Sequence, residues 1–301
     1  MAWNASVAAG DFPDWESYFY PGTTVLRNLF GERDQYKLNE LELMAVKSRS
    51  FVLAADPIAG GFDLEHLQAI HRHLFQDVYA WAGELRTAPL FPVSMVKGGP
   101  SPESIAIGDY DAGDQHPYQY FPAGDGMVSH LLMWFTRLNE PTDYASMRPS
   151  EFAAVIAEPW GEINAAHPFR EGNTRAQIMF FTQFTATHGH FLDYERFARD
   201  DWFRAKFNAG RFLAQYNTDT SLLADALSQV IDRRMTGKPR SSRGILPAYE
   251  PHYISDPSGS TGLPPESTRQ DPNRPDTMGV SQSPDCPSQP RKTTRTGTFR
   301  D

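Results

Sequence analysis

The sequence predicts an all-α body that contains one small β element and is followed by a disordered C-terminal tail. Apolar residues recur at spacings of three and four over most of residues 16–235. Only residues 90–96 have the composition of a strand, and Pro92 interrupts them. Residues 236–301 hold 11 of the 24 prolines and no apolar run of helix length. Such a segment cannot bury enough surface to offset the entropy of ordering the chain, so we expect it to stay disordered.

The composition is that of one domain with loose ends. Hydrophobic residues make up 40% of the 301 residues and aromatic residues 13%, which is enough for a core. We expect this domain over residues 16–235, after a loose lead over residues 1–15. The tail carries 9 Lys and Arg against 7 Asp and Glu, which leaves 19 against 30 for the rest of the chain. An acidic body argues against general binding to DNA or RNA, so we expect no nucleic-acid partner.

Targeting and redox features are few. No stretch approaches the length of a membrane-spanning apolar segment, so no membrane span is expected. The N-terminus lacks the basic and apolar regions of a secretion signal, which favours a cytoplasmic location and leaves delivery to another cell open. Cys286 is the one cysteine of the sequence, which excludes a disulfide scaffold and a cysteine-rich metal site.

The first half of the body is predicted to hold three helices. Thr24 follows a Pro-Gly turn and suits the N-cap of a short helix over residues 25–30. Apolar spacing predicts a second helix over residues 34–55. Asp63 suits the cap of a third helix, which we expect to reach Tyr79. The apolar positions of this third helix are spaced by three and four residues: Leu64, Leu67, Ile70, Leu74 and Val78.

Residues 83–125 interrupt the helical pattern. They are rich in Gly and Pro, and the strand-like patch at residues 90–96 lies among them. We therefore expect a hairpin-like excursion and a long loop, and a loop of this length is usually functional or mobile. Apolar spacing predicts that helices then resume over residues 127–138, 149–166, 173–187, 195–216 and 220–235.

Residues 167–175, His-Pro-Phe-Arg-Glu-Gly-Asn-Thr-Arg, lie between two of these helices. Pro168 disfavours the α conformation in the residue before it, so the chain should turn there. Phe169 is the apolar residue of a polar loop and is expected to plug the core. Gly172 permits a close backbone approach or a positive φ, and Asn173 suits the start of the next helix.

The start of that next helix is a candidate anion site. The first N–H groups of a helix lack partners within the helix, and the dipole adds about half a positive charge. Arg175 lies one turn in and can add a fixed charge. Glu171 would repel phosphates unless a divalent cation such as Mg²⁺ bridged them. His167 is the nearby group that can take a proton near neutral pH. The combination indicates a nucleotide-phosphate site with a metal and a base, suited to transferring part of a nucleotide onto a hydroxyl.

Each of these residues has an ordinary explanation when it is taken alone. Most histidines at helix ends are surface or capping residues, and Gly172-Asn173 could simply form a turn. His71 and His73 lie two positions apart on a predicted helix, so they face different directions and are better explained as core or surface histidines than as co-ligands. It is the concentration of chemical groups in residues 167–175 that favours a functional site.

Residues 167–175 resemble the signature of the Fic family, His-Pro-Phe-x-Glu-Gly-Asn-x-Arg. Residues 62–87 are similar to the family's helix that leads into its flap, and Trp160-x-x-Ile163-Asn164 is similar to the usual approach to the signature. Residues 20–23, Tyr-Pro-Gly-Thr, resemble the start of bacterial, toxin-like members. The likeness extends over residues 15–215.

The resemblance implies a Fic-type helical bundle with a small β-hairpin flap over the active site. Most Fic proteins transfer AMP from ATP onto a Tyr, Thr or Ser hydroxyl of a target protein and release pyrophosphate. Carried over by position, His167 would deprotonate the target hydroxyl, and Glu171 would hold Mg²⁺ on the α- and β-phosphates. The nucleotide-binding residues would be Asn164, Gly172, Asn173, Thr174 and Arg175.

The resemblance also implies a place for the target protein. Residues Val96 to Gly99 would fall in the flap, where a segment of the target is expected to add as an extended strand. Lys97 within this segment is explained equally well as a solvated turn residue or as a working residue of the flap.

Two positions depart from the common family pattern. Thr174 stands where most members have Gly or Lys, and Ile178 stands where many carry a second arginine that grips the γ-phosphate. Many members are inhibited by a helix with Ser/Thr-x-x-x-Glu followed by Gly or Asn. The nearest candidate here, residues 136–140, is followed by Pro141. We therefore expect no internal inhibitory helix. A role as a bacterial toxin or effector, with an antitoxin-like partner in trans, is an option.

Two alternatives to AMP transfer stay open. One is another nucleotidyl or phosphoryl transfer, as the Doc-like kinases perform. The other is a catalytically weak interaction protein that binds partners through its acidic body and tail.

Overall fold

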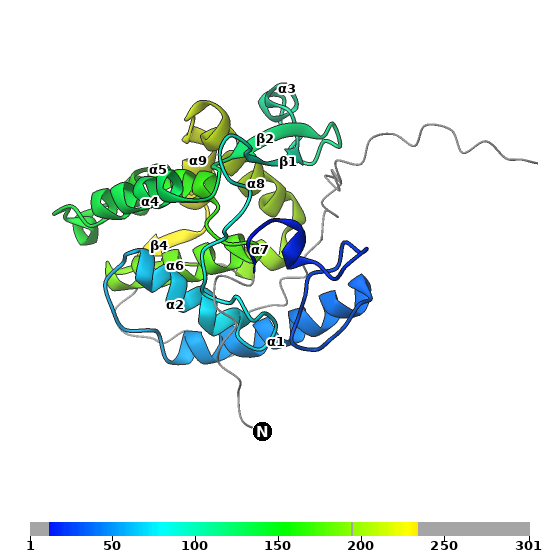
Figure 1. The fold of residues 1–301 in the computed structure, drawn as a ribbon. Helices are drawn as coiled ribbons and strands as arrows, with labels where there is room; N and C mark the ends of the chain where they lie inside the picture. The colour runs from blue at the N-terminus through cyan, green and yellow to red at the C-terminus, as the bar shows by residue number, and fades with distance from the viewer. Residues whose placement is uncertain (1–11, 194, 234–301) are drawn as a thin grey trace, which may run out of the picture. The chain divides into compact units, whose positions relative to one another are not determined.

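The computed structural model describes residues 12–193 and 195–233 (Figure 1). Its helices are α1 (Gln35–Ala55), α2 (Leu64–Phe75), α3 (Pro102–Ala106), α4 (Asp125–Leu138), α5 (Pro149–Ala166), α6 (Asn173–Thr187), α7 (Glu195–Arg199), α8 (Asp201–Asn217) and α9 (Ser221–Ser228). Its strands are β1 (Met95–Gly99), β2 (His116–Tyr120), β3 (His190–Leu192) and β4 (Ile231–Arg233). The predicted all-α class with a small hairpin is confirmed. The predicted disordered tail, residues 236–301, and most of the predicted loose lead lie outside the described residues.

The helices pack in a continuous series that runs upward in Figure 1. α1 contacts α2, α2 contacts α6, α6 contacts α5, and α5 contacts α4, α8 and α9. α5 and α6 are therefore the centre of the domain, and the loop between them is the segment that carries the sequence motif.

The centre is held by aromatic packing. Trp160 of α5 stacks on Phe181 of α6, with ring centroids 4.1 Å apart and planes 9° from parallel. Both side chains are fully buried, as is Phe169 of the loop between the helices, which confirms its predicted role as a core plug. Burial of each large apolar side chain contributes about 1.5–3 kcal/mol to stability, so this core fixes the geometry of the motif.

The predicted starts of the first two long helices are confirmed. The Asp34 carboxylate accepts a bond from Lys37 N at 3.1 Å at the start of α1, and the Asp63 carboxylate accepts one from His66 N at 2.9 Å at the start of α2. The predicted end of α2 at Tyr79 is wrong, because α2 ends at Phe75. Beyond it, Tyr79 donates to the Glu42 carboxylate of α1, and this tertiary contact is made by a chain that has left the helix, where Tyr79 also stacks on Trp81.

The predicted short helix over residues 25–30 is also wrong. Leu26 instead forms an antiparallel bridge with Phe19. The Thr23 hydroxyl accepts a bond from Val25 N at 3.2 Å and donates to Tyr20 O at 2.9 Å. The Thr23 hydroxyl thus closes a turn, and no helix begins after Thr24, the predicted N-cap. The extended chain that follows buries Val25 and Leu26 in the core.

The flap is an antiparallel pair of strands, β1 and β2, with Met95 opposite Tyr120 and Gly99 opposite His116. The short helix α3 lies between the strands in sequence. The strand-like patch predicted at residues 90–96 is displaced toward the C-terminus, since β1 begins at Met95. Pro92 supplies no N–H for a ladder, which is consistent with pairing that starts beyond it.

The C-terminal helices are shorter than predicted. The helix expected over residues 195–216 is divided into α7 and α8, because the Asp200 carboxylate caps α8 by accepting a bond from Phe203 N at 2.9 Å. The helix expected over residues 220–235 ends at Ser228, and β4 pairs antiparallel with β3. This second small sheet buries Leu192 and Ile231 side by side, which a continued helix would not do.

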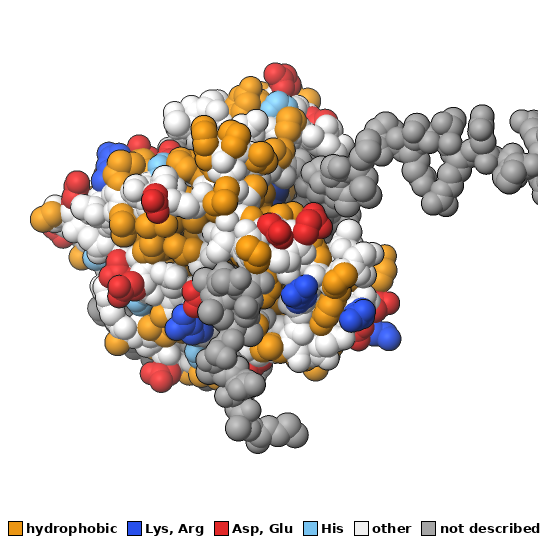
Figure 2. Space-filling model, in the orientation of Figure 1, with side chains coloured by type: hydrophobic (Ala, Val, Ile, Leu, Met, Phe, Trp, Pro, Cys, Tyr) orange, Lys and Arg blue, Asp and Glu red, His pale blue; other side chains and the backbone are white. Residues whose placement is uncertain are grey.

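Hydrophobic side chains also gather on the outside of the domain, over the region of α4 and α5 (Figure 2). The exposed members there include Leu132, Met133 and Val155. Single apolar side chains on a surface are common in folded proteins. Of the helices in residues 12–193 and 195–233, none has the length and apolarity needed to cross a membrane.

Candidate functional site

The motif loop, residues 167–172, begins where α5 ends. His167 adopts a left-handed conformation with φ 48° and ψ 63°, so the chain turns at the residue before Pro168, as the sequence predicts. Gly172 has φ 83°, which glycine adopts without strain, and α6 begins at the next residue. These two turns present the N-terminus of α6 toward the loop.

The loop is rigid because neighbouring side chains bond its backbone. The Asn173 amide donates to Phe169 O at 2.7 Å and accepts from Phe169 N at 2.9 Å. His71 of α2 stacks on the Phe169 ring, with centroids 3.8 Å apart. The Nε2 atom of His71 lies 2.9 Å from Glu171 O, and its Nδ1 atom accepts from Gly83 N at 2.8 Å. His71 is therefore a core histidine, as its sequence position favours, and it fixes the loop from one side.

A buried arginine holds the loop from another side. The Arg86 guanidinium donates to His167 O at 2.7 Å, to Ala166 O at 3.1 Å and to Ala88 O at 3.2 Å, and it also donates to Phe121 O. Ala88 precedes the flap strands and Phe121 follows them. One side chain thus joins the motif loop to both ends of the flap.

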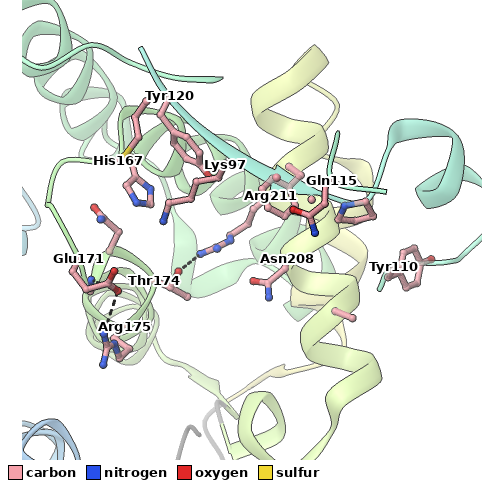
Figure 3. Close-up of a pocket in the computed structure, with 18 of the residues that line it drawn as sticks. Lys97, Tyr110, Gln115, Tyr120, His167, Glu171, Thr174, Arg175, Asn208 and Arg211 are labelled. Atoms are coloured by element: carbon pink, nitrogen blue, oxygen red, sulfur yellow. Dashed lines mark hydrogen bonds and ion pairs between the residues drawn. The ribbon is translucent and has the colours of Figure 1, made fainter. Parts of the chain in front are cut away.

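A cavity of about 250 Å³ lies between the flap, the motif loop, the start of α6 and one face of α8 (Figure 3). His167, Lys97 and Glu171 lie at one end of it in this view, and Tyr110, Gln115 and Asn208 lie toward the other. The cavity is lined by four cationic side chains, Lys97, Arg170, Arg175 and Arg211, and two anionic ones, Asp111 and Glu171. A site with this excess of positive charge suits an elongated anion.

The structure brings most of the predicted site residues together. His167, Glu171, Gly172, Asn173, Thr174 and Arg175 all line the cavity. Asn164 does not line it. It is buried in α5, and its Oδ1 atom has no hydrogen-bond partner within the described residues. Its assignment to the nucleotide stays a prediction.

His167 is a neutral imidazole at the cavity wall. Its ring centroid lies 4.4 Å from that of Tyr120 of β2, and its Nδ1 atom accepts no bond from any described residue. Burial holds the pKa of His167 well below its usual range, and the positive charges of Lys97 and Arg86 lower it further. A neutral histidine has one unprotonated ring nitrogen and can accept a proton, which is the property the sequence predicts for it.

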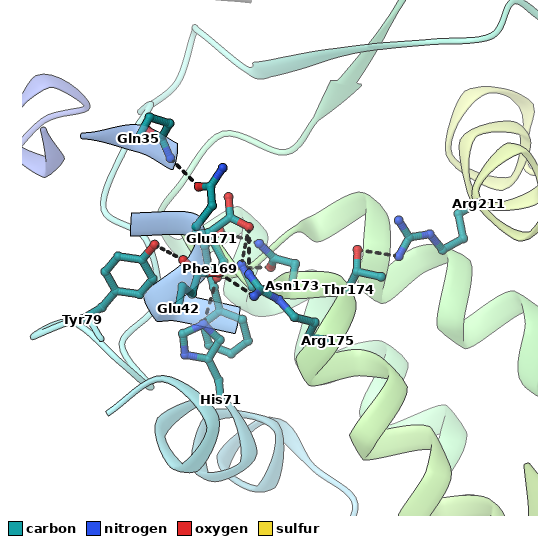
Figure 4. Close-up of polar contacts among 12 residues, drawn as sticks. Gln35, Glu42, His71, Tyr79, Phe169, Glu171, Asn173, Thr174, Arg175 and Arg211 are labelled. Carbon is teal, nitrogen blue, oxygen red and sulfur yellow. Dashed lines mark hydrogen bonds and ion pairs between the residues drawn. The ribbon is translucent and has the colours of Figure 1, made fainter. Parts of the chain in front are cut away.

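Glu171 is ionised in spite of its surroundings. Desolvation opposes its charge, but Lys97, Arg175 and the Gly172 N–H together lower its pKa. The Gly172 N–H donates to Glu171 Oε1 at 2.9 Å, and Arg175 Nη2 lies 3.4 Å from the same oxygen. Figure 4 shows that Arg175 lies between this carboxylate and a second one, Glu42 of α1.

No cluster of three or more metal-ligating side chains is present in residues 12–193 and 195–233. A single carboxylate beside a helix N-terminus nevertheless suits a hard divalent cation that brings phosphate oxygens and water as its other ligands. The bonds of Glu171 with Gly172 and Arg175 both involve Oε1. Oε2 is therefore the oxygen of this carboxylate that would bind a cation carried by a phosphate substrate.

Several residues of the site were missed at the level of sequence. Glu42 of α1 lies far from the motif along the chain, as do Asn208 and Arg211 of α8, and only the folded chain brings them to it. The signal that could have indicated α8 is the spacing of Asn208, Arg211 and Phe212, which places them on one helical face. The apolar spacing predicted only a helix over this stretch.

The fold and the site together define a class of protein, a helical domain with a positively charged cavity at a helix N-terminus under a hairpin flap. The profile of the Fic/DOC family matches residues 61–185. The probable protein adenylyltransferase y4lH of Sinorhizobium fredii is 34% identical over 176 residues, which are 58% of this chain and 77% of that protein. The chain belongs to the Fic/DOC family, and the resemblance seen in the sequence is confirmed.

A second relative is longer than the matched region. The protein adenylyltransferase VbhT of Bartonella schoenbuchensis is 30% identical over 194 residues. These are 64% of this chain but only 36% of VbhT.

Solved structures share the fold. The BepC protein of Bartonella tribocorum, with bound AMPPNP, has a TM-score of 0.59 at 23% identity and covers 72% of this chain and 97% of its own. The N-terminal Fic domain of a Bartonella quintana effector, with bound ADP, also has a TM-score of 0.59 at 23% identity. It covers 73% of this chain and 96% of its own.

Proposed function

We propose that this chain is a protein adenylyltransferase, which transfers AMP from ATP to a Tyr, Thr or Ser hydroxyl of a target protein. The observation that carries the proposal is the position of a neutral His167 in one cavity with the N-terminus of α6. The relatives VbhT and y4lH are named as protein adenylyltransferases, and BepC binds AMPPNP, which supports the same chemistry.

In the proposed reaction His167 takes the proton of the target hydroxyl. The hydroxyl oxygen then bonds to the α-phosphorus of ATP, and the bond from that phosphorus to the bridging oxygen of the β-phosphate breaks. Pyrophosphate leaves with the electron pair of the broken bond. A positioned general base contributes about 10²–10⁴-fold to a rate, so positioning and charge stabilisation must supply most of the remainder.

The start of α6 would hold the phosphates. The backbone N–H groups of Asn173 and Thr174 lie in the first turn, where helical N–H groups lack partners within the helix. Gly172 N already donates to Glu171 Oε1, so its contribution is to orient that carboxylate. Glu171 would hold Mg²⁺, which supplies charge neutralisation to the phosphates when bound. Arg175 would keep the Glu171 carboxylate in place and add positive charge beside the phosphates.

The target would add to the flap. β1 pairs with β2 on one side, and the described residues place no strand along its other edge. An extended segment of the target can bond to this edge over Val96–Gly99, in the manner of β-strand addition. Such binding would place a side chain of the target over the cavity, where His167 lies.

The test is a labelling experiment. The full chain is incubated with bacterial lysate, Mg²⁺ and ATP labelled either at the α- or at the γ-phosphate, beside the His167→Ala variant. Adenylyl transfer predicts α-label on target proteins, no γ-label, and neither with the variant. Label from γ-labelled ATP alone would instead show phosphoryl transfer. Equal background labelling by the wild type and the variant would identify a binding protein without this activity.

Metal use is tested separately. Glu171→Gln keeps the size of the side chain and removes its charge. We expect it to abolish the dependence of nucleotide affinity on Mg²⁺, measured by calorimetry with and without EDTA. An unchanged dependence would remove the proposed role of this carboxylate. An antitoxin-like partner in trans stays a prediction that co-purification from the native host would test.

A further inference from the structure

Arg211 of α8 lies in the wall of the cavity, next to the first turn of α6. Its Nη1 atom donates to Thr174 Oγ1 at 2.9 Å (Figures 3 and 4). Only 8% of Arg211 is exposed. In Figure 3 the pair lies between the end of the cavity with His167 and Glu171 and the end with Tyr110 and Asn208.

The position of Arg211 is set by the neighbouring contacts of α8 with the flap. Phe212 stacks on Tyr118 of β2 with centroids 4.4 Å apart, and Gln215 donates to Gln119 O. Gly99 of β1 approaches the Phe212 ring so closely that a Cβ at that position would lie 2.7 Å from it. Arg211 is therefore held by a helix that is itself fixed to the flap, and its guanidinium lies beside the start of α6.

The bond between Arg211 and Thr174 orients the guanidinium. A threonine hydroxyl accepts a hydrogen bond and brings no negative charge. The positive charge of Arg211 is felt inside the cavity, since it is one of the charges that lower the pKa of His167. The same charge would act on an anion bound between His167 and the start of α6.

We propose that Arg211 is a phosphate-binding residue of the nucleotide site and that the Thr174 hydroxyl positions it. A guanidinium presents its N–H groups in a planar fork that matches phosphate oxygens, and it does so here beside the helix N-terminus that attracts the same anion. The inference rests on the proposed function and deepens it, because it names a residue that selects a phosphorylated nucleotide over a neutral nucleoside.

The test is a pair of affinities measured on the full chain without a target protein. One probe is α,β-methylene-ATP, whose bridge between the α- and β-phosphates adenylyl transfer cannot cleave. The other is adenosine, which carries no phosphate. We expect Arg211→Gln to lower the affinity for α,β-methylene-ATP by about tenfold to a hundredfold, the range for a charge-assisted bond. The affinity for adenosine should stay within about twofold of the wild-type value. Calorimetry at constant salt measures both affinities.

The chain offers a matched control on the same helix. Arg204 of α8 pairs with Asp201 and is not among the residues that line the cavity. Arg204→Gln makes the same change of charge, and we expect it to leave both affinities unchanged. Thr174→Val removes the hydroxyl at nearly constant volume and should reproduce part of the Arg211→Gln loss, whereas Thr174→Ser should keep the affinity.

The results that overturn the proposal are distinct. Equal losses of affinity for α,β-methylene-ATP and adenosine would show that Arg211 contacts the nucleoside rather than the phosphates. No loss of affinity for either ligand would show that Arg211 does not take part in binding. If thermal unfolding shows that Arg211→Gln does not fold, the same affinities are measured with Arg211→Lys and Thr174→Val instead. Wild-type affinity for α,β-methylene-ATP in both variants would refute the proposal. Selective binding without adenylyl transfer would defeat the proposed function and leave this inference standing. Adenylyl transfer by the wild type, together with wild-type nucleotide affinities in the Arg211 variants, would support the proposed function and refute this inference.

Discussion

Glu42 of α1 and Arg175 of α6 form a buried ion pair, with 2.5 Å between Glu42 Oε1 and Arg175 Nη1. The Tyr79 hydroxyl donates to the other oxygen of the same carboxylate, and Arg175 also reaches Glu171 (Figure 4). The pair joins the first long helix to the first turn of α6, where the motif ends. It therefore sets both the stability of the domain and the position of the Glu171 carboxylate.

Removing Glu42 should destabilise the domain strongly. Glu42→Ala leaves the Arg175 charge buried without its closest carboxylate, and breaking a buried pair in this way costs about 3–5 kcal/mol. We expect a loss of this size in the free energy of unfolding, measured by urea denaturation at pH 7. The matched control is Glu158→Ala, which removes an exposed partner 4.0 Å from Arg137 and should cost less than about 1 kcal/mol. Similar losses for the two variants would contradict this account.

Gly172 should not tolerate a side chain. A Cβ there would lie 2.4 Å from the Phe75 ring, and the residue has φ 83°, which other residues adopt at a cost. Overpacking and backbone strain together predict a loss of about 2–5 kcal/mol for Gly172→Ala. Gly189 has φ 78° and no atom within 4 Å of such a Cβ, so Gly189→Ala should show the backbone cost alone, about 1–2 kcal/mol. Thermal unfolding of both variants measures the difference. Equal shifts in melting temperature would refute the proposed steric clash with Phe75.

The pH dependence of the reaction should report His167. Its pKa is lowered well below the ordinary value of 6.5, and only the neutral ring accepts a proton. The value of kcat/KM for ATP should therefore stay high as pH falls through 6.5 and decline only below it. Bound triphosphate is strongly negative and should raise the pKa of the ring, so the decline in kcat should have a higher midpoint than that in kcat/KM. His167→Ala should lower kcat by about 10²–10⁴-fold at pH values above this decline, where the wild-type ring is neutral. A decline of kcat/KM centred above 6.5 would exclude His167 as the base.

Folding stability should depend on His71. Burial lowers the pKa of His71 from 6.5 to about 3, so the folded protein holds this ring neutral while the unfolded chain would protonate it. Its contribution is fully present above pH 6.5 and is lost as pH falls from 6.5 toward 3, by at most about 5 kcal/mol. His71→Gln does not titrate, so its free energy of unfolding should fall less steeply over this range, although it should be lower than that of the wild type at pH 7. Urea denaturation at several pH values measures both slopes, and parallel slopes would show that another group titrates.

The motif and the helices around it could be predicted because their signals are local. Asp34 and Asp63 cap helices with their own side chains, and Gly172 supplies the positive φ that ends the loop. Pro168 restricts the residue before it, whatever the rest of the chain does. Such preferences act within a few residues, so they are legible before any tertiary contact is known.

The errors arise where distant contacts override local preference. Apolar spacing extends past Phe75 and past Ser228, but a bond between Tyr79 and Glu42 and the pairing of β4 with β3 redirect the chain at these points. Residues 25–30 suit a helix by composition, but a bridge between Leu26 and Phe19 holds the chain there extended. Each of these competing contacts depends on where the chain lies in space rather than on its local composition.

The sequence by itself determined which residues are the candidates for the chemistry: a histidine, a carboxylate and a helix N-terminus within one loop. Only the tertiary structure decided what surrounds them. Glu42, Arg86 and Arg211 come from three other segments, and each acts through a charge placed within a few ångströms of the motif. Electrostatic and hydrogen-bond energies depend on distance in space, and no pattern along the chain encodes that distance.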